Sequence, residues 1–342
     1  MTAARRGAII GFGNVAEKGH LPGWLDAPDF EIVAVADPAP QRRDLAETLI
    51  AGARTYADYE DLLAREELDF VDIASPPAFH ASAIIAAAHS GVDIVCEKPL
   101  TTRIDDYRPV RRAVDEAGSL LHVVHNWKYS EAFRALGEIL ARGSVGKLTH
   151  IAFETRRNGW AASDDDWRSK RAVAGGGILV DHGWHNFYLI LALAQQDPVA
   201  VSATVERLRY VDADIEDTAG CEIDFPDLKA EIRLTWAASG RRTRWELKAE
   251  RGGIVIDDDV VEVETRSGTQ TQRLVSGLSA GSHHADWFPG VIDSFRRELT
   301  DPEMRGANRR EAEWCLVLLA QAYAAAAENR AIPLMSPAVL LA

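Results

Sequence analysis

The sequence has few cysteines, and this shortage excludes a disulfide-stabilised scaffold and a cysteine-based metal site. Only three of the 342 residues are cysteine, and Cys96, Cys221 and Cys315 are far apart. Their spacing fits neither a disulfide framework nor a metal-binding motif. Because such sparse use of cysteine is typical of a reducing compartment, we expect a cytoplasmic protein.

Long apolar runs are also missing. After Arg5 and Arg6 the apolar run covers only residues 8–10, which is too short for the core of a signal peptide. The longest run, residues 315–327, is interrupted by Gln321 and falls short of the ~20 residues that a membrane span requires. We therefore expect no membrane partner.

Positive charge is scarce as well. The chain has 38 Lys and Arg residues against 52 Asp and Glu, a formal net charge of -14. With no basic stripe to offset this charge, nucleic acid is not expected as a partner. Hydrophobic residues make up 47% and charged residues 26%, which is ordinary for a globular protein. A chain of this length usually forms two domains.

The first motif follows a short apolar strand at residues 8–10. Gly11-x-Gly13-x-x-Ala16 has the form of a dinucleotide-binding fingerprint, a weak signal when it stands alone. Gly11 permits a tight turn, and Gly13 lets backbone N–H groups approach a pyrophosphate at a helix N-terminus. Asn14 and Val15 belong to the same predicted cofactor-binding turn.

An acidic residue ends the next strand, residues 31–36. Asp37 at this position is expected to bind the adenosine ribose hydroxyls and to repel a 2′-phosphate, which favours NAD. It could instead be a helix N-cap before Pro38. Arg42 and Arg43 follow closely and could bind a 2′-phosphate, so NADP stays possible.

Strands and helices then alternate. Strands are expected at residues 70–74, 92–95 and 120–124, separated by helices at 80–90 and 102–117. This alternation predicts a parallel sheet with right-handed crossovers, and hence a Rossmann domain over residues 1–124. The loops after Ile10, Ala74 and Val95 should lie along one edge of the sheet, where such folds hold their ligands.

A lysine occupies one of these loops. Glu97-Lys98-Pro99 follows the strand at 92–95, and Pro99 stiffens the backbone that carries the Lys98 ammonium. In isolation, the simpler interpretation of Lys98 as a solvated lysine at a strand end would be favoured.

The pattern changes in the second half. A helix is expected at residues 130–142, a strand at 148–155, and a long polar loop at 156–174. From residue 200 to 266 the chain shows repeated strands with short connections, followed by helices at 287–299 and 309–329. This arrangement predicts an α+β domain over residues 125–342 with a large, mostly antiparallel open sheet. One sheet face could be solvated or could meet another subunit.

Within this half, three glycines precede a predicted helix over residues 178–194. Asp181 and His185 are four residues apart on it and so share a face, an arrangement that suits a general base. The pair could also be purely structural. A third interpretation, with Asp181, His182 and His185 as metal ligands, lacks the rest of a coordination shell, and we expect no metal.

Taken together, these motifs resemble those of the glucose–fructose oxidoreductase / inositol dehydrogenase (Gfo/Idh/MocA) family. The matching segments are Gly11-x-Gly13-x-x-Ala16, Ser75-Pro76-Pro77-x-x-His80, Glu97-Lys98-Pro99 and Gly175-Gly-Gly-x-Leu-x-Asp181-x-Gly183-x-His185. The resemblance implies a Rossmann domain and a C-terminal domain whose sheet forms a homodimer or homotetramer.

The resemblance also implies roles for individual residues. Lys98 would lie beside the nicotinamide and the substrate oxygen, and Asp181 and His185 would complete the catalytic site, with His185 transferring the proton. Further cofactor contacts are implied at Ser75, Pro76, His80, Glu97 and Asn126.

Three positions depart from the family pattern. Lys128 replaces the usual Arg in an Asn-x-Arg segment, Tyr188 replaces a second Asp, and His182 replaces an aliphatic residue. These departures leave the exact substrate open.

The predicted reaction is hydride transfer between NAD(P) and a secondary hydroxyl or ketone of a sugar, cyclitol or sugar derivative. His185, oriented by Asp181, would take the hydroxyl proton, and Lys98 would stabilise negative charge on the oxygen. The substrate would also contact Lys128 and His182, and it would be covered by loop residues Trp160, Trp167 and Arg168.

Two other functions fit the same scaffold. One is a redox-neutral, glycosidase-like enzyme that uses bound NAD transiently. The other is a non-catalytic sugar or nucleotide sensor, which would not need Lys98, Asp181 and His185 together.

Overall fold

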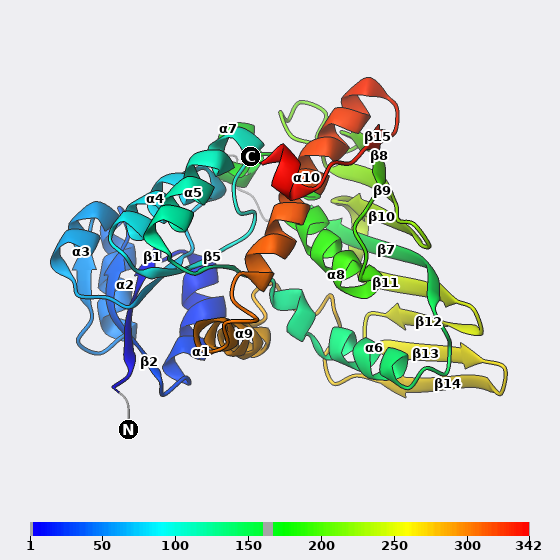
Figure 1. Ribbon diagram of the computed structural model, residues 1–342, viewed down its shortest axis with the longest axis horizontal. Helices are drawn as coiled ribbons and strands as arrows, with labels where there is room; N and C mark the ends of the chain where they lie inside the picture. Colours follow the sequence, from blue (N-terminus) through cyan, green and yellow to red (C-terminus); the bar gives the residue numbers. More distant parts are fainter. Residues whose placement is uncertain (1–2, 160–166, 342) are drawn as a thin grey trace. The chain divides into compact units, whose positions relative to one another are not determined.

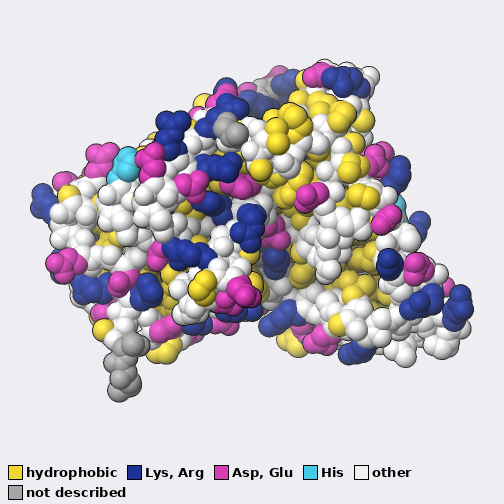
Figure 2. Space-filling model, in the orientation of Figure 1, with side chains coloured by type: hydrophobic (Ala, Val, Ile, Leu, Met, Phe, Trp, Pro, Cys, Tyr) yellow, Lys and Arg dark blue, Asp and Glu magenta, His cyan; other side chains and the backbone are white. Residues whose placement is uncertain are grey.

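The computed structural model describes residues 3–159 and 167–341, which form two compact units (Figure 1). The first unit comprises the described residues up to Asn126, together with residues 283–312 and Leu341. The second comprises the described residues of 127–282 and residues 313–340. The visible surface of each carries interspersed acidic and basic side chains rather than a basic stripe (Figure 2).

The first unit is built on a six-stranded parallel sheet in the order β3-β2-β1-β4-β5-β6. From β1 the chain winds one way to β3 and then returns to β4 on the other side of β1. The change of direction between β1 and β4 is the point where folds of this kind bind ligands. The strands are β1 Arg5–Ile10, β2 Phe30–Ala36, β3 Arg54–Tyr56, β4 Phe70–Ile73, β5 Asp93–Cys96 and β6 Leu121–Val123.

Helices cover both faces of this sheet (Figure 1). Helix α5 shows why they form: Tyr107, Val110 and Val114 are buried at helical spacing, and Gly118 ends the helix in the left-handed conformation. The helices of this unit are η1 Ala16–His20, α1 Leu21–Leu25, α2 Pro40–Leu49, α3 Tyr59–Arg65, η2 Pro77–Phe79, α4 His80–His89, α5 Ile104–Ala117, η6 Ala285–Trp287 and α9 Phe288–Thr300.

Residues 283–312 return to the first unit from far along the sequence. Asn308 links this segment to edge strand β6, because its side chain accepts the Val123 N–H at 2.6 Å and donates to the Val123 carbonyl at 2.9 Å. His122 on β6 also bonds Glu298 of α9 at 2.6 Å. The compact units thus differ from the expected division into 1–124 and 125–342, because residues 283–312 bond to strand β6 of the first unit.

The second unit contains a nine-stranded sheet in the order β14-β13-β12-β11-β7-β10-β9-β8-β15. All neighbours are antiparallel except β7 and β10, which are parallel. The predicted fold class is therefore confirmed, although strands β14 and β15 were not expected. The strands are β7 Leu148–Asn158, β8 Ala200–Glu206, β9 Thr218–Asp224, β10 Lys229–Thr235, β11 Ala237–Ala249, β12 Gly252–Asp257, β13 Val260–Thr265, β14 Gly268–Arg273 and β15 Ile332–Pro333.

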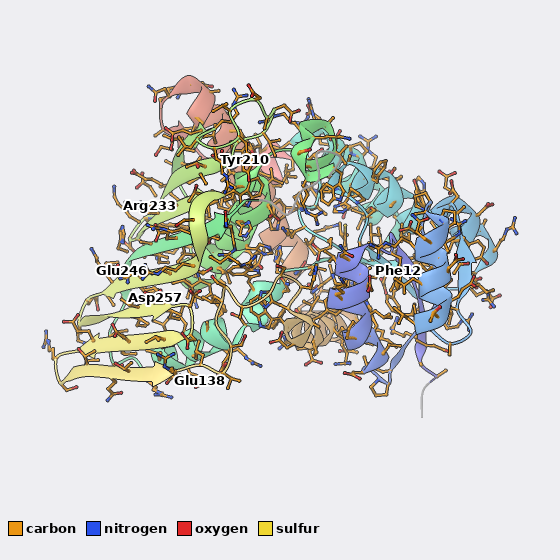
Figure 3. All side chains as sticks on the ribbon, turned by 180° about the vertical axis from the view of Figure 1, so that it is seen from behind. Phe12, Glu138, Tyr210, Arg233, Glu246 and Asp257 are labelled. Carbon is orange, nitrogen blue, oxygen red and sulfur yellow. The ribbon has the colours of Figure 1, made fainter. Side chains whose placement is uncertain are left out.

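Apolar and charged residues alternate along these strands, so the two faces of the sheet differ. Ile232 and Leu247 are buried on the face that the helices cover. Arg233, Glu246 and Asp257 project from the other face (Figure 3).

The unit's helical elements are η3 Asn126–Tyr129, which begins at the unit boundary, α6 Glu131–Ala141, η4 Trp167–Ser169, α7 Arg171–Ala174, η5 Leu179–Gly183, α8 Trp184–Ala194, α10 Ala307–Glu328, which starts in the first unit, and α11 Pro337–Leu340. In the described part of the chain, no helix has the length and apolar character to cross a membrane.

Candidate active site

The carboxyl ends of β1, β4 and β5 lie level with one another. The Ala74 N–H donates to the Ile10 carbonyl at 2.9 Å, and the Glu97 N–H donates to the Ile73 carbonyl at 2.8 Å. These bonds continue the sheet ladder by one residue into each loop. The predicted glycine turn, the Ser75 loop and the Lys98 loop are therefore neighbours along one edge.

Gly11 is required by the close approach of two of these loops. Its φ is +88°, and a Cβ there would lie 2.7 Å from both the Cα and the N of Ser75. Gly13 is different, since a Cβ at that position would meet no described atom within 4 Å. Packing within the described chain thus explains why residue 11 must be glycine, but it gives no reason for glycine at residue 13. Val15 is the residue before η1.

Asp37 joins the glycine turn to the end of β2. Its carboxylate accepts the Phe12 N–H at 2.8 Å and the Ala39 N–H at 2.9 Å, and the residue is buried. The alternative interpretation of Asp37 as a helix N-cap is wrong, because Ala39 is the N-cap of α2. Asp37 instead forms a side-chain turn that precedes the helix.

The two arginines after Asp37 both have partners within the chain. Arg42 donates to Glu17 at 2.9 Å and to the Asn14 side chain at 3.0 Å. Arg43 donates to the Asp37 carbonyl at 2.8 Å. Arg42 and Asn14 therefore lie together at the rim of the glycine turn.

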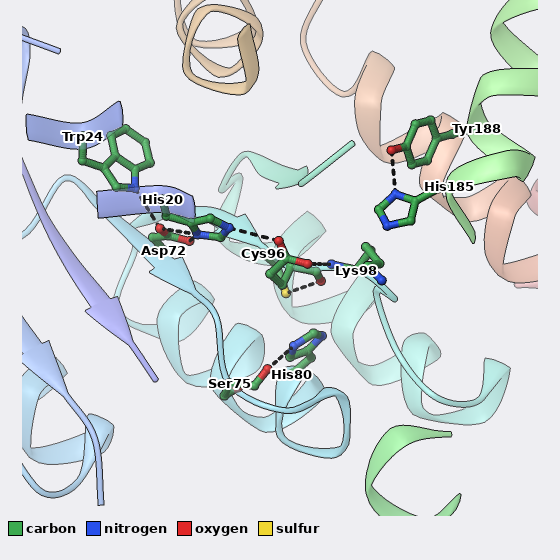
Figure 4. Close-up of polar contacts among 10 residues, drawn as sticks. His20, Trp24, Asp72, Ser75, His80, Cys96, Lys98, His185 and Tyr188 are labelled. Carbon is green, nitrogen blue, oxygen red and sulfur yellow. Dashed lines mark hydrogen bonds and ion pairs between the residues drawn. The ribbon is translucent and has the colours of Figure 1, made fainter. Parts of the chain in front are cut away.

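The Lys98 loop is held by buried contacts (Figure 4). Glu97 accepts the Lys98 N–H at 3.0 Å, and the Lys98–Pro99 peptide bond is cis. The ring of His80, which is fully buried, lies 2.8 Å from the Pro99 carbonyl and 2.9 Å from the Ser75 carbonyl. His80 thus links the Lys98 loop to the Ser75 loop, where Pro76 precedes η2.

Two residues predicted to bind the cofactor carry buried oxygen atoms with unused hydrogen-bonding capacity. Ser75 Oγ and Asn126 Oδ1 have no partner among the described residues. Buried polar atoms are usually paired, so each such case requires an explanation. The space around Gly13 also lets a ligand come close to the backbone. Together, these features fit a polar ligand such as a dinucleotide along this edge.

A buried histidine next to this loop was not predicted from the sequence. His20 contacts Glu97 at 3.0 Å through Nε2 and Asp72 at 2.9 Å through Nδ1. Trp24 donates to the same Asp72 carboxylate at 2.7 Å. The sequence did contain one indication of such a contact. Asp72 lies within the apolar strand at 70–74, and a buried carboxylate must have a polar partner.

In the second unit, a buried glutamate holds the glycine loop before the predicted site helix. Glu216 accepts the Gly177 N–H at 2.9 Å and the Tyr323 hydroxyl at 2.7 Å. A Cβ on Gly177 would lie 1.8 Å from the Glu216 carbonyl oxygen, so only glycine fits. A carboxylate near the first N–H groups of a helix stabilises it. This role of Glu216 was not predicted from the sequence.

The expected continuous α-helix over residues 178–194 was wrong in its first turn. Leu179–Gly183 forms a π-helical turn, η5, and the α-helix α8 starts at Trp184. A Cβ on Gly183 would lie 2.8 Å from the Leu179 side chain, which shows how closely this turn is packed. Wide turns of this kind are rare and frequently occur at functional sites.

His185 is oriented by a tyrosine. Its Nδ1 lies 2.8 Å from the Tyr188 hydroxyl, which also accepts the Trp127 N–H at 3.0 Å. The Trp127 ring stacks on the imidazole with centroids 5.1 Å apart. Tyr188, one of the departures from the family pattern, therefore occupies the position of an orienting group at Nδ1.

The neighbouring Asp181 contacts His182, with 3.1 Å between Oδ2 and Nδ1. The ring centroids of His182 and His185 are 6.5 Å apart. No group of three or more potential ligands in residues 3–159 and 167–341 could hold a metal ion. The metal-site interpretation of Asp181, His182 and His185 is therefore not supported.

The other predicted substrate residues also lie in the second unit. Trp167 and Arg168 belong to η4, and the Arg168 guanidinium lies 4.3 Å from the centroid of the Trp167 ring. Lys128 belongs to η3. Trp160 lies outside the described residues. Lys98, by contrast, is part of the first unit.

Two sugar-active proteins are among the relatives of this chain. The D-apiose dehydrogenase of Paraburkholderia graminis is 36% identical over 141 residues, which span 41% of this chain and 37% of that relative. The 1,5-anhydro-D-fructose reductase of Ensifer adhaerens is 22% identical over 95% of this chain and 97% of its own length.

The fold also matches a solved structure. An Agrobacterium radiobacter oxidoreductase in complex with NAD+, L-tartaric acid and magnesium has a TM-score of 0.83 and 22% identity, with 97% of this chain and 98% of that chain covered.

The family itself is shown by two matches that together cover most of the chain. Residues 5–125 match the model of an oxidoreductase family with an NAD-binding Rossmann fold, and residues 133–255 match the GFO/IDH/MocA C-terminal domain. As its motifs predicted, this chain is a member of the GFO/IDH/MocA family of oxidoreductases.

Proposed function

We propose that the protein is a dehydrogenase or reductase of sugars, cyclitols or their derivatives, and that Lys98, Asp181 and His185 form its catalytic site. The proposal rests on the edge of the first unit's parallel sheet at which the strands end and the loops begin. There Gly11, Gly13 and Asp37 follow β1 and β2, and Lys98 follows β5, two strands away from β1. The dinucleotide would lie on this edge, with its pyrophosphate at the glycine turn and its ribose near Asp37.

Nearby groups would complete the cofactor site. Ser75 Oγ and Asn126 Oδ1, the buried oxygens without described partners, would accept or share hydrogen bonds with the cofactor. Asn14 at the rim and Glu97 and His80 behind the Lys98 loop would fix the loops that surround it.

The bound nicotinamide supplies the hydride chemistry, and the protein supplies position, charge and a path for the proton. In the oxidative direction a carbinol hydroxyl must lose its proton as the hydride leaves. We assign this proton to His185, which would lie within hydrogen-bond reach, about 3 Å, of the substrate oxygen. The Lys98 ammonium would stabilise negative charge that develops on the same oxygen.

The hydroxyl of Tyr188 matters for this proton transfer. A carboxylate at Nδ1 can only accept a hydrogen bond, whereas a phenol can either donate or accept one. The 2.8 Å contact therefore supports His185 in both neutral tautomers. Such a ring can take a proton in oxidation and return it in reduction. Asp181, which contacts His182, would act on the substrate side of the helix.

The substrate class is inferred from the relatives and from the predicted covering residues. Both named relatives act on sugars by their names. The Trp167 ring and the Arg168 guanidinium, stacked 4.3 Å apart, would offer an apolar face and hydrogen-bond donors of the kind that sugar hydroxyls require. Lys128 and His182 would add polar contacts.

Removal of either central group tests the assignment. We expect Lys98→Ala and His185→Ala each to lower kcat/KM by roughly 100-fold or more, because each removes a group that acts on the reacting oxygen. Activity would be measured by nicotinamide absorbance with a panel of sugars, inositols and sugar acids. Lys147→Ala and His89→Ala, at exposed positions outside the strands, serve as matched controls.

Near wild-type kcat in both site variants would contradict the assignment. Substrate turnover without net formation of NADH, by a protein that purifies with NAD bound, would instead indicate the redox-neutral reaction. Ligand binding without any turnover would indicate a sensor.

Tyr188→Phe tests the orienting role of the hydroxyl. We expect kcat to fall by about tenfold or more, because the imidazole loses its partner at Nδ1, while substrate KM changes little. Stability should fall by about 1–3 kcal/mol, since the buried Trp127 N–H loses its acceptor. Tyr56→Phe, which removes a tyrosine–carboxylate bond in the first unit, controls for the loss of a hydroxyl. A wild-type kcat in Tyr188→Phe would show that the hydroxyl plays no catalytic part.

Cofactor preference depends on the charge of Asp37. We expect NADH to bind more tightly than NADPH in fluorescence titrations, because this carboxylate repels a 2′-phosphate. Asp37→Asn keeps one side-chain acceptor for the backbone but removes the charge, so the preference should shift toward NADPH. Arg42→Ala should weaken NADPH binding alone if Arg42 can turn from Glu17 to a phosphate. A strong wild-type preference for NADPH would refute the role of Asp37.

We also propose that the helix-free face of the nine-stranded sheet joins two or more copies of the chain. That face carries charged pairs, including Arg233–Glu231 and Arg244–Glu246, which could exchange partners across an interface. Light scattering should give the mass of a dimer or tetramer. Arg233→Glu should weaken the assembly, while Glu303→Arg, on the first unit, should not. A monomer at all concentrations would rule this interface out.

A further inference from the structure

Four charged or polar groups form a continuous chain in the first unit, three of them buried and the fourth, Glu97, half-buried (Figure 4). Trp24 donates to Asp72 at 2.7 Å, Asp72 contacts His20 Nδ1 at 2.9 Å, and His20 Nε2 contacts Glu97 at 3.0 Å. The second oxygen of Glu97 accepts the Lys98 N–H at 3.0 Å. The chain thus leads from the core of the sheet to the backbone of the proposed catalytic lysine.

With both neighbouring carboxylates ionised, the geometry favours a positive charge on His20. Each of its ring nitrogens faces a carboxylate oxygen, and a carboxylate can only accept hydrogen bonds. A neutral imidazole has a single N–H, so one of its nitrogens would present a lone pair to an anion. Protonation at both nitrogens gives two charge-assisted bonds.

The surroundings of His20 support the same conclusion. Only 2% of the residue is exposed, and its ring stacks on Phe288 with centroids 4.2 Å apart. Burial alone would lower the pKa of His20, but the charges and hydrogen bonds of Asp72 and Glu97 outweigh it and raise the pKa to about 10. The ring therefore stays protonated over the whole physiological range.

We propose that His20 is a positioning residue: as a permanent imidazolium it keeps the Glu97 carboxylate ionised and fixed against the Lys98 amide, and so sets the position of the Lys98 side chain. This inference rests on the proposed role of Lys98. His20 belongs to η1, directly after the glycine turn, so the same contact also joins the dinucleotide-binding turn to the loop that carries the lysine.

The charged groups around Glu97 come from several elements. His20 approaches from η1 and His80 from α4, and Lys98 follows in the same loop, while Asp72 of β4 lies at the other nitrogen of His20. Burial alone would raise the pKa of Glu97, but the bond and charge of His20, with Lys98, lower it. Burial lowers the pKa of His80, whose ring nitrogens lie against the Ser75 and Pro99 carbonyl oxygens, and raises that of the adjacent Cys96 thiol. Among the residues described, His20 is the group from another element whose ring nitrogen bonds the Glu97 carboxylate directly.

The protonation state can be measured without any substrate. In 15N-edited NMR of the wild-type protein, with the signals assigned through the His20→Gln variant, we expect both ring nitrogens of His20 to be protonated at pH 8.5. A neutral tautomer at that pH would overturn the proposal. This readout does not depend on catalysis.

The effect on the active site is measured by the pH profile of kcat/KM. Without the His20 cation, burial should raise the pKa of Glu97, so in His20→Gln the ionised carboxylate persists only at higher pH. We expect the acid limb of the profile to move up by about one pH unit, with kcat falling roughly tenfold near pH 6. His122→Gln is the matched control, because His122 is a buried histidine bonded to Glu298 and does not touch Glu97.

A second substitution distinguishes an effect of His20 on the Glu97 charge from a nonspecific loss of structure. In a Glu97→Gln background the charge at residue 97 is fixed at zero, so His20→Gln should no longer shift the acid limb. A shift that persists in this background, or a His20→Gln profile that matches His122→Gln, would overturn the inference. If the wild type has no oxidoreductase activity, the proposed function fails, while the NMR result still decides the charge of His20.

Discussion

The whole site depends on one constraint, which is that neighbouring parallel strands end at the same edge of a sheet. The register pairs Ile10 of β1 with Ile73 of β4, and Ile73 with Cys96 of β5. The three loops that follow therefore begin level with one another, although they lie far apart in the sequence. Gly11 allows the first two loops to touch, and His80 bonds to both the second and the third.

The polar groups behind this edge form a second layer that makes the loops rigid. Asp37 holds the glycine turn by the Phe12 N–H, and Glu97 holds the lysine loop by the Lys98 N–H. Both carboxylates bind backbone groups, so each fixes a loop and contributes negative charge near the cofactor edge. In the second unit, Glu216 does the same for the glycine loop before η5. These three acids thus order the three segments that carry the proposed site.

Much of this could be predicted from the sequence, because the signals were local. The glycine pattern, the alternation of strands and helices, and the Lys98 and His185 motifs each lie within a short window. The six-stranded parallel sheet follows from such windows, since β-α-β units have one preferred handedness. Of its strands, β3 alone was not predicted, because its residues Arg54–Tyr56 include no buried apolar run, whereas the equally short β6 is wholly buried.

Contacts between distant residues could not be predicted in this way. His20 meets Asp72 and Glu97 across 52 and 77 positions, and Asn308 meets Val123 across 185. No local pattern identifies such partners, although a charge inside an apolar strand indicates that one exists. The π-helical turn at Leu179–Gly183 was missed for a similar reason, because packing rather than propensity produces it. The role of Tyr188 appeared only when its hydroxyl was seen between Trp127 and His185.

The central claim is that a cation from the first unit and an imidazole from the second act on one substrate oxygen beside the nicotinamide. A crystal structure of the protein with bound NAD+ and a substrate or unreactive analogue tests it most directly. The account predicts the nicotinamide at the carboxyl edge of the parallel sheet, with Lys98 Nζ and His185 Nε2 both within about 3 Å of the same ligand oxygen. A nicotinamide elsewhere, or a reacting oxygen that neither side chain contacts, would contradict it.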